Sequence, residues 1–341
     1  MPITRSDLSH DEHADISVQI LSRRPASGSK RAYWFDTEDV AGNKIPVLVW
    51  EKHRGLAEHI STGEKARLRD FKVKSWPEQE TQLHTVSNSS VEPVERRKTR
   101  ILHVSDSHLG YHLRPTSGGK MMPWHDEVDC QARFRDVIVA AFENDVDAVV
   151  HTGDVFDHAV CDEDLDLLEY GVKILASEGI PFFYVLGNHD REKGRARLRK
   201  LSNAGLAYPL EEALQGQSIG DVTLYGLDNR DANWWRNPDI RFTPNDTRYS
   251  VLCLHQTVSP PYSKDSPDCT LDTILNSVAS RLSPDLLLLG DLHGPFSDSD
   301  ASVPVYYSGP TARISYQYED ADPRANLFEF DGKPHHITIR L

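Results

Sequence analysis

Five groups of carboxylate, imidazole and amide side chains each follow directly on a short apolar run. The groups are Asp106 and His108 in SDSHLG, Asp154 and Asp157 in GDVFD, Asn188, His189 and Asp190 in GNHD, His255 in CLHQT, and Asp291 and His293 in GDLHG. Ligands of open α/β sheets gather outside the carboxyl ends of the strands, so we expect the five groups to converge on one crevice.

This mixture of donors suits a pair of hard or borderline divalent ions such as manganese, iron or zinc. Two ions about 3.5 to 4 Å apart can hold a bridging hydroxide, bind the oxygens of a phosphate and stabilise both the entering and the leaving oxygen. The chemistry that these residues imply is therefore phosphoester hydrolysis.

The elements that must position these groups alternate between β and α patterns in the last two thirds of the chain. Apolar runs and amphipathic periods predict strands at 101–105, 148–151, 182–186, 222–226, 249–254, 286–289, 305–307, 325–330 and 337–341, and helices at about 129–144 and 164–178. This alternation predicts an α/β fold with the layers of a sandwich.

The first third of the chain has a different pattern, with short β-like runs broken by glycine and proline. Strands are expected at 16–23, 31–36, 44–50, 66–76 and 81–86, with a short helix at 55–60 between the third and the fourth. This is the element order of a small all-β OB barrel. We therefore expect a tail at 1–15, a barrel at 16–86, an exposed linker at 87–99 and the α/β domain at 100–341.

The five motifs, in this order, resemble those of the calcineurin-like metallophosphoesterase family over nearly all of residues 99–341. The resemblance implies a four-layer α/β/β/α sandwich. It also implies that one metal is held by Asp106, His108, Asp154 and His293, and the other by Asp154, Asn188, His255 and Asp291, with Asp154 as the bridge. Position 291 usually holds histidine in this family. An aspartate there adds negative charge, which favours manganese over zinc; alternatively, it leaves the second site weak.

The resemblance also implies roles for the residues beside the metal ligands. His189 is expected to orient the phosphate or to protonate the leaving oxygen, because an imidazole titrates near neutral pH. Asp157 and Asp190 are expected to act as acceptors that fix the orientation of imidazole rings. For Asp157, a place at a helix N-terminus is an equal alternative.

Within the superfamily, the segments ILHVSDSHLGYH, VDAVVHTGDVFDH and IPFFYVLGNHD are most similar to DNA-repair exonucleases of the SbcD type. Those nucleases pair with an SMC-like repair ATPase through a segment after the last histidine motif. Only 48 residues follow His293, so we expect the usual docking segment to be absent. The stretch from Tyr33 to Phe71 resembles the single-stranded-DNA-binding OB domains of replication protein A. A barrel before a phosphoesterase also resembles the small subunits of replicative polymerases.

An OB barrel binds single strands with basic residues and stacks their bases on aromatic rings. Candidates on the barrel are Trp34, Lys72, Lys74 and Trp76, whereas Trp50 and Phe71 are expected in its core. A solvated face is the alternative for Lys72, Lys74 and Trp76. The basic run REKGRARLRK, residues 191–200, includes Arg191 and Arg195 and follows the GNHD motif, where it could hold a substrate backbone. A solvated amphipathic helix is the alternative there.

The charge and the cysteine content limit which partners and which cellular compartment the protein can have. The net charge of −14 is uneven: residues 1–98 hold 16 Lys and Arg against 15 Asp and Glu, and residues 99–341 hold 22 against 37. A nucleic-acid surface is therefore easier to place in the first third. The four cysteines are too few and too scattered to staple the chain, and no apolar span or signal peptide is evident. We expect a cytoplasmic protein without a membrane contact.

Together these features predict a manganese-dependent phosphodiesterase with two divalent ions, acting as an exo- or endonuclease in DNA repair. Its DNA is expected to be single-stranded or to carry single-stranded ends. One alternative is a phosphatase or small-nucleotide phosphodiesterase. The other is a non-catalytic DNA-binding scaffold that resembles the polymerase small subunits.

Overall fold

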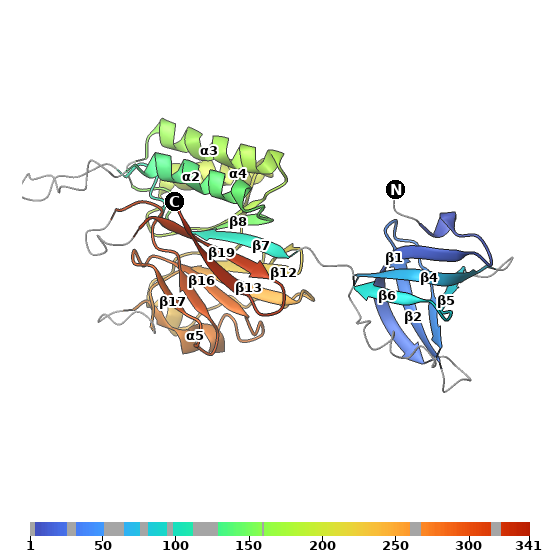
Figure 1. The fold of residues 1–341 in the computed structure, drawn as a ribbon. Helices are drawn as coiled ribbons and strands as arrows, with labels where there is room; N and C mark the ends of the chain where they lie inside the picture. The colour runs from blue at the N-terminus through green and yellow to red at the C-terminus, as the bar shows by residue number, and fades with distance from the viewer. Residues whose placement is uncertain are drawn as a thin grey trace, which may run out of the picture. The chain divides into compact units, whose positions relative to one another are not determined.

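The computed structural model describes residues 4–25, 32–50, 65–75, 81–93, 98–111, 129–158, 160–259, 267–314 and 322–341. Contacts within the chain divide it into two compact units, Met1–Arg97 and Lys98–Leu341. Each unit is described by itself below, and Figure 1 gives the element labels. No helix among the described residues is long and apolar enough to cross a membrane.

The first unit is a closed β-barrel. Its strands are β1 (His13–Pro25), β2 (Ala32–Asp39), β3 (Val47–Trp50), β4 (Lys65–Lys74), β5 (Gln82–His84) and β6 (Ser90–Pro93), after a 3-10 turn at Arg5–Asp7. The order β1-β2-β3-β5-β4 closes because β1 also pairs with β4. This five-stranded closure is that of an OB fold, which confirms the predicted barrel. The helix expected at 55–60 and the candidate Trp76 lie outside the described residues.

Alternation along the strands separates the barrel core from its surface. Phe35 and Phe71 are fully buried with Ile16, Val49 and Leu83, so the core position predicted for Phe71 is confirmed. The core position predicted for Trp50 is wrong: this residue ends β3 with 40% of its surface exposed. Because Trp50 is the last residue of β3, its indole lies outside the barrel core.

Strand β6 lies within the segment expected to be the linker, 87–99. It pairs antiparallel with β4, where Leu68 faces Val91 and Arg69 faces Ser90. The pairing covers an edge of β4 that would otherwise expose free backbone groups. A short strand with few apolar residues gives little sequence signal, so composition alone made it look like a loop.

The second unit is a sandwich of two sheets. The first sheet has the order β10 (Ala207–Pro209), β9 (Phe182–Val185), β8 (Ala148–Thr152), β7 (Thr99–Val104), β19 (Arg324–Phe330) and β20 (His335–Arg340). The second has β11 (Gln217–Ile219), β12 (Val222–Leu227), β13 (Tyr249–His255), β16 (Leu286–Gly290), β18 (Val305–Tyr307) and β17 (Phe296–Asp298). A small pair, β14 (Val258–Ser259) and β15 (Cys269–Thr270), lies outside both sheets.

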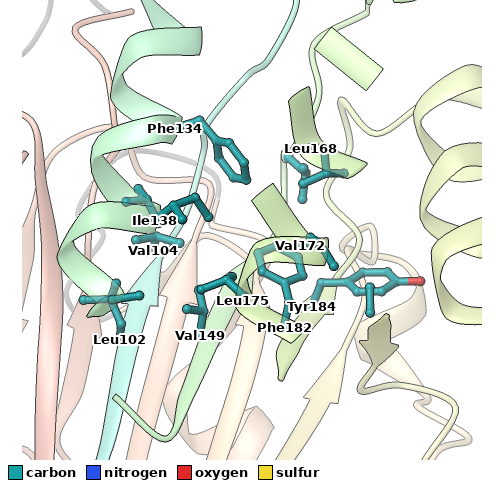
Figure 2. Packing of buried hydrophobic residues seen from close by; sticks show 14 of the residues in the cluster. Leu102, Val104, Phe134, Ile138, Val149, Leu168, Val172, Leu175, Phe182 and Tyr184 are labelled. Carbon is teal, nitrogen blue, oxygen red and sulfur yellow. The ribbon is translucent and has the colours of Figure 1, made fainter. Parts of the chain in front are cut away.

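Helices cover both outer faces, which confirms the predicted four-layer α/β/β/α fold. The first sheet is covered by α2 (Cys130–Glu143), α3 (Asp162–Ser177) and α4 (Glu192–Asn203). The second is covered by α5 (Leu271–Asn276) and the 3-10 turn Trp234–Arg236. Figure 2 shows side chains of α2, α3 and the first sheet meeting in one layer, among them Phe134, Leu168 and Leu102.

The central strands are buried on both faces, and this explains their unbroken apolar runs. All residues of β8, β9, β12 and β16 are buried. Between the sheets, Val150 and Phe183 of the first pack with Leu224, Val251 and Leu288 of the second. Packing on both faces fixes the positions of the parallel strands. The loops that hold the candidate metal ligands follow the carboxyl ends of these strands.

Candidate metal centre

The five predicted groups lie at the carboxyl ends of parallel strands. Asp106 and His108 follow β7, Asp154 and Asp157 follow β8, and Asn188, His189 and Asp190 follow β9 of the first sheet. His255 ends β13, and Asp291 and His293 follow β16 of the second sheet. Both sheets therefore deliver side chains to one site, as the strand pattern predicts.

The loops that carry these side chains have unusual backbones. Asp106, His108, Asp154 and Asp291 have φ values of 52°, 44°, 54° and 80°, a region that residues other than glycine rarely adopt. Hydrogen bonds hold the strained turns: the Asp106 amide donates to the Gly153 carbonyl and the His108 amide to the Asp154 carbonyl, both at 3.0 Å. Strain of this kind is characteristic of functional sites, because it is retained only where the surroundings enforce it.

The glycines of the motifs allow the loops to approach each other closely. A Cβ atom at Gly187 would lie 2.0 Å from Oδ1 of Asp154. A Cβ atom at Gly290 would lie 2.2 Å from the Ser105 hydroxyl and the Thr152 carbonyl. Neither position tolerates a side chain while Asp154 and His255 keep their places.

Among the described residues, four groups of three donors have ligand atoms within 4.8 Å of one another, close enough to share a cation. Two of them contain only predicted metal ligands: Asp106, His108 and His293 form one, and Asp106, Asp154 and His255 form another. The other two contain His189, together with His108 and Asp154 or with Asp157 and His158. His108 Nε2 lies 3.9 Å from Asp106 Oδ1 and 3.5 Å from Asp154 Oδ2. His293 Nε2 lies 3.8 Å from Asp106 Oδ1. These separations exceed hydrogen bonds and leave room for an ion between the donors.

Around His255, acceptor atoms face one another. Its Nδ1 donates to the Thr152 carbonyl at 2.7 Å, so in the neutral ring Nε2 carries a lone pair. Nε2 lies 3.4 Å from Asp154 Oδ2, 3.1 Å from Asn188 Oδ1 and 3.7 Å from Asp291 Oδ1. Converging acceptors need a positive charge between them.

Burial and the neighbouring carboxylates shift the pKa values of His255 and Asp291. Burial opposes a charge on His255, yet the carboxylates of Asp154, Asp106 and Asp291 raise its pKa well above the usual value. Burial raises the pKa of Asp291 to about 6.

In His108, both buried ring nitrogens have no partner at hydrogen-bond distance among the described residues. A buried imidazole without a partner is costly unless it ligates a metal, so the donors present fit divalent cations.

Asp157 and His189 form a pair beside this cluster. His189 Nδ1 donates to Asp157 Oδ1 at 2.8 Å, which leaves Nε2 of the ring available. Burial opposes ionisation of Asp157, but the neighbouring His108 ring and the hydrogen-bonded His189 ring hold its pKa well below the usual value. Asp157 therefore orients His189. The ring of His158 stacks on His189 with centroids 4.1 Å apart, a contact that sequence reasoning missed because His158 belongs to no motif.

Asp190 has a different role from the one that the sequence suggests. Its carboxylate accepts backbone N–H groups from Asp154 at 3.0 Å, Phe156 at 2.9 Å and Gly187 at 2.8 Å, and only 1% of the residue is exposed. Burial and the Asp154 carboxylate raise the pKa of Asp190 to about 6. Asp190 thus fixes the backbone of two ligand loops and does not orient an imidazole.

Residues 192–200 of the basic run lie in the amphipathic helix α4, and only part of the positive charge of this helix is available. Arg197 and Lys200 pair with Glu169 of α3. Arg191 and Arg195 are exposed, and Arg195 donates to the Asp190 carbonyl at 2.6 Å, directly beside His189. The sequence showed the excess of cations but not the acidic side chains of α3 that neutralise Arg197 and Lys200.

The barrel candidates share one outer face. The ring of His84 lies edge-on to Trp34 at 6.1 Å and to Trp50 at 6.5 Å between centroids. Lys72 faces His84 across the strands, and both Lys72 and Lys74 contact the Asp11 carboxylate. His84 was not among the predicted contacts, and the core was the favoured position for Trp50, because the outward direction of both side chains depends on strand register.

A four-layer sandwich that gathers carboxylate, imidazole and amide donors at the carboxyl ends of both sheets defines a protein of the metallophosphoesterase class. Comparison with known families agrees with this class. Residues 99–298 match the calcineurin-like phosphoesterase family, and the chain belongs to that family.

Curated relatives extend this result. The chain is 34% identical over 245 residues to the DNA double-strand break repair protein Mre11 of Haloferax volcanii, covering 71% of this chain and 51% of that protein. It is 30% identical over 261 residues to the Mre11 protein of Methanosarcina acetivorans, covering 72% and 39%. The chain thus spans about half, or less, of the length of these relatives.

Solved structures are similar to this chain as well. One is the solution structure of the replication factor A related protein from Methanobacterium thermoautotrophicum, with 16% identity and a TM-score of 0.24. That similarity covers 28% of this chain and 92% of the other.

Proposed function

We propose that the chain is a manganese-dependent phosphodiesterase that cleaves DNA. The observation that carries the proposal is the convergence of Asp106, His108, Asp154, His255 and His293, whose carboxylate oxygens and imidazole nitrogens lie close enough together to share divalent cations. The relatives named for DNA double-strand break repair support DNA as the substrate.

In this proposal Asp106, His108, Asp154 and His293 hold one ion, and Asp154, Asn188, His255 and Asp291 hold the other. When bound, such ions activate water and stabilise the charge on phosphate oxygens. The chain's own contribution is His189, which Asp157 orients so that Nε2 can hold or deliver a proton to the leaving oxygen. His158, stacked against its other face, limits rotation of the ring.

Manganese is favoured by the donor set. Asp291 contributes an oxygen 3.7 Å from His255 Nε2, where the family usually has an imidazole. An additional carboxylate raises the negative charge of the second site and makes its ligands harder, and hard ligands suit manganese better than zinc.

We further propose that the barrel binds single-stranded DNA on the face formed by Trp34, Trp50 and His84. Trp50 is 40% exposed, so a base can stack on its ring. Lys72 and Lys74 lie on the same face, and a phosphate would compete with Asp11 for them. A Trp34→Ala, Trp50→Ala variant should bind a fluorescent single strand about 100-fold more weakly, since each stacked base contributes about 1–3 kcal/mol. Val40→Ala, an exposed apolar change away from this face, should leave binding unchanged.

The enzymatic test uses end-labelled single-stranded and duplex DNA in manganese, with 4-nitrophenyl phosphate and bis(4-nitrophenyl) phosphate as small substrates. We expect the full chain to cleave DNA, and His189→Gln to cleave it at least about 100-fold more slowly with its metal content unchanged. A matched control is His335→Gln, an exposed histidine on β20.

Two other results would contradict the proposed DNA cleavage and would favour an alternative function. Hydrolysis of small phosphoesters with intact DNA would assign a phosphatase or a small-nucleotide phosphodiesterase. No hydrolysis and no bound manganese at millimolar concentration would assign a DNA-binding scaffold.

A further inference from the structure

Beside the metal centre, the edge of the first sheet carries a pair of arginines that no motif predicts. Strand β19 runs antiparallel to β7, with Asn326 facing His103. Arg324 lies two residues further along β19, beyond the end of this ladder, because Ser105 pairs with Pro310 instead. Arg324 in turn faces Arg340 on β20. Because neighbouring strands lie about 4.8 Å apart, Arg340 is about 10 Å from β7.

Like charges placed directly across an antiparallel pair destabilise the sheet unless something neutralises them. Within the described residues, Asp322 contacts three guanidinium groups here, two through its carboxylate and one through its backbone carbonyl. Asp322 pairs with Arg313 at 3.0 Å and with Arg340 at 2.8 Å, while Arg324 donates to its backbone carbonyl at 3.3 Å. The side chain of Arg340 is 80% exposed. The edge therefore keeps an excess of positive charge.

Two hollows flank this pair. A cavity of about 390 Å³ is lined by Arg133 of α2, which pairs with Asp136 at 2.7 Å, together with Arg313, Asp322 and Arg340. On the other side, a smaller hollow of about 90 Å³ is lined by Arg324, Asn326 and Thr338 and extends to Pro295, two residues after His293. Tyr111 donates to the Ile314 carbonyl at 3.4 Å, which joins the Arg313 loop to the loop after His108. Arginines thus line a hollow on each side of the Arg324–Arg340 pair.

This concentration of arginines contrasts with the rest of the domain, where residues 99–341 hold 22 basic against 37 acidic residues. An acidic surface repels a polyanion, so a long substrate needs a local cationic path to reach the site. A small phosphoester needs no such path.

We propose that Arg133, Arg313, Arg324 and Arg340 bind the phosphates of a nucleic-acid strand on one side of the scissile bond. The inference rests on the proposed phosphodiesterase function and names the class of its substrate, a polynucleotide that continues across β19 and β20. Arg324 binds the phosphate nearest the metals, and Arg340 and Arg133 bind those further out.

The experiment compares the full-length protein with an Arg324→Gln, Arg340→Gln variant. The readouts are kcat/KM for a labelled oligonucleotide between 50 and 300 mM salt, and kcat/KM for bis(4-nitrophenyl) phosphate. The matched control is Arg248→Gln, Arg281→Gln, two exposed arginines that precede β13 and β16 and so lie at the opposite edge of the sandwich. An Arg324→Lys, Arg340→Lys variant keeps the charge.

We expect the glutamine variant to lose about tenfold in kcat/KM for the oligonucleotide, and the slope of log kcat/KM against log salt to flatten by about 1.5, for two lost phosphate contacts. Hydrolysis of the small diester should stay within about twofold, and the lysine variant should recover most of the loss. An unchanged salt slope, or an equal loss of kcat/KM for both substrates, would overturn the proposal that these arginines bind phosphates. If the wild-type protein hydrolyses no phosphodiester at all, the proposed function fails instead, and anisotropy binding of the same oligonucleotide still tests the arginines.

Discussion

Asp190 offers a sharp test of how the ligand loops are held. We expect Asp190→Asn to lower the free energy of unfolding by about 3 kcal/mol. The wild-type carboxylate accepts three buried N–H groups at 2.8–3.0 Å. An asparagine has one acceptor oxygen, and its NH2 group must face at least one of those donors. One or two N–H groups then lose their partner, and each costs about 1–3 kcal/mol when buried.

The assay is urea unfolding of the metal-free protein at pH 7.5, above the pKa of about 6 of Asp190, followed by a manganese titration. Because the same bonds fix the backbone of Asp154 and Gly187, manganese affinity should fall by about 10–100-fold although Asp190 touches no ion. The control is Asp231→Asn, since Asp231 also accepts two backbone N–H groups, from Asn233 and Trp234, but is exposed, so water replaces lost bonds. Equal stability of Asp190→Asn and wild type would refute the reasoning.

Three further predictions concern packing, pH and metal. Gly187→Ala should destabilise the metal-free protein by about 2 kcal/mol more than Gly179→Ala, because the Cβ at position 187 would lie 2.0 Å from Asp154 Oδ1, whereas Gly179→Ala meets nothing within 4 Å and costs only the backbone strain of a φ of 74°; equal urea midpoints would contradict this. Burial lowers the pKa of His103 to about 3, against about 6.5 unfolded, so its stabilising contribution is complete above pH 6.5 and is lost as the pH falls. Between pH 7 and pH 5 the wild type should therefore lose about 2 kcal/mol more than His103→Leu, and parallel pH profiles would argue against a neutral buried imidazole. Manganese at 100 times its Kd should stabilise the protein by about 2.7 kcal/mol, measured by thermal unfolding, and chelation should remove the gain; Asp106→Asn should show little of it, and an equal gain would place the ion elsewhere.

Much of the sandwich could be predicted because its signals are local. The buried runs of β8, β9 and β16 and the N-cap of α2, where Asp129 accepts from the Ala132 amide at 2.7 Å, are readable from neighbouring residues. The convergence of five motifs follows from one rule about the ends of parallel strands. The fold and the membership of the site could therefore be inferred before any coordinates.

The features that could not be predicted depend on pairings between residues that are distant in the sequence. Strand β6 exists because β4 offers it an edge, and Arg324 meets Arg340 only through the register of β19 and β20. The direction of Trp50 and the amide contacts of Asp190 likewise arise from tertiary packing, not from any sequence period. Interactions of this kind leave no pattern within a short window of the chain.

The central claim is that the convergent donors hold metal ions that hydrolyse phosphodiester bonds. The most direct measurement is the rate of bis(4-nitrophenyl) phosphate hydrolysis against manganese concentration, for the wild-type protein and for Asp154→Asn, whose wild-type carboxylate lies between His108 and His255 at 3.5 and 3.4 Å. We predict that hydrolysis rises with manganese, is abolished by chelation, and falls at least about 1,000-fold in the variant. Hydrolysis that is independent of manganese, or equal in the two proteins, would contradict the account.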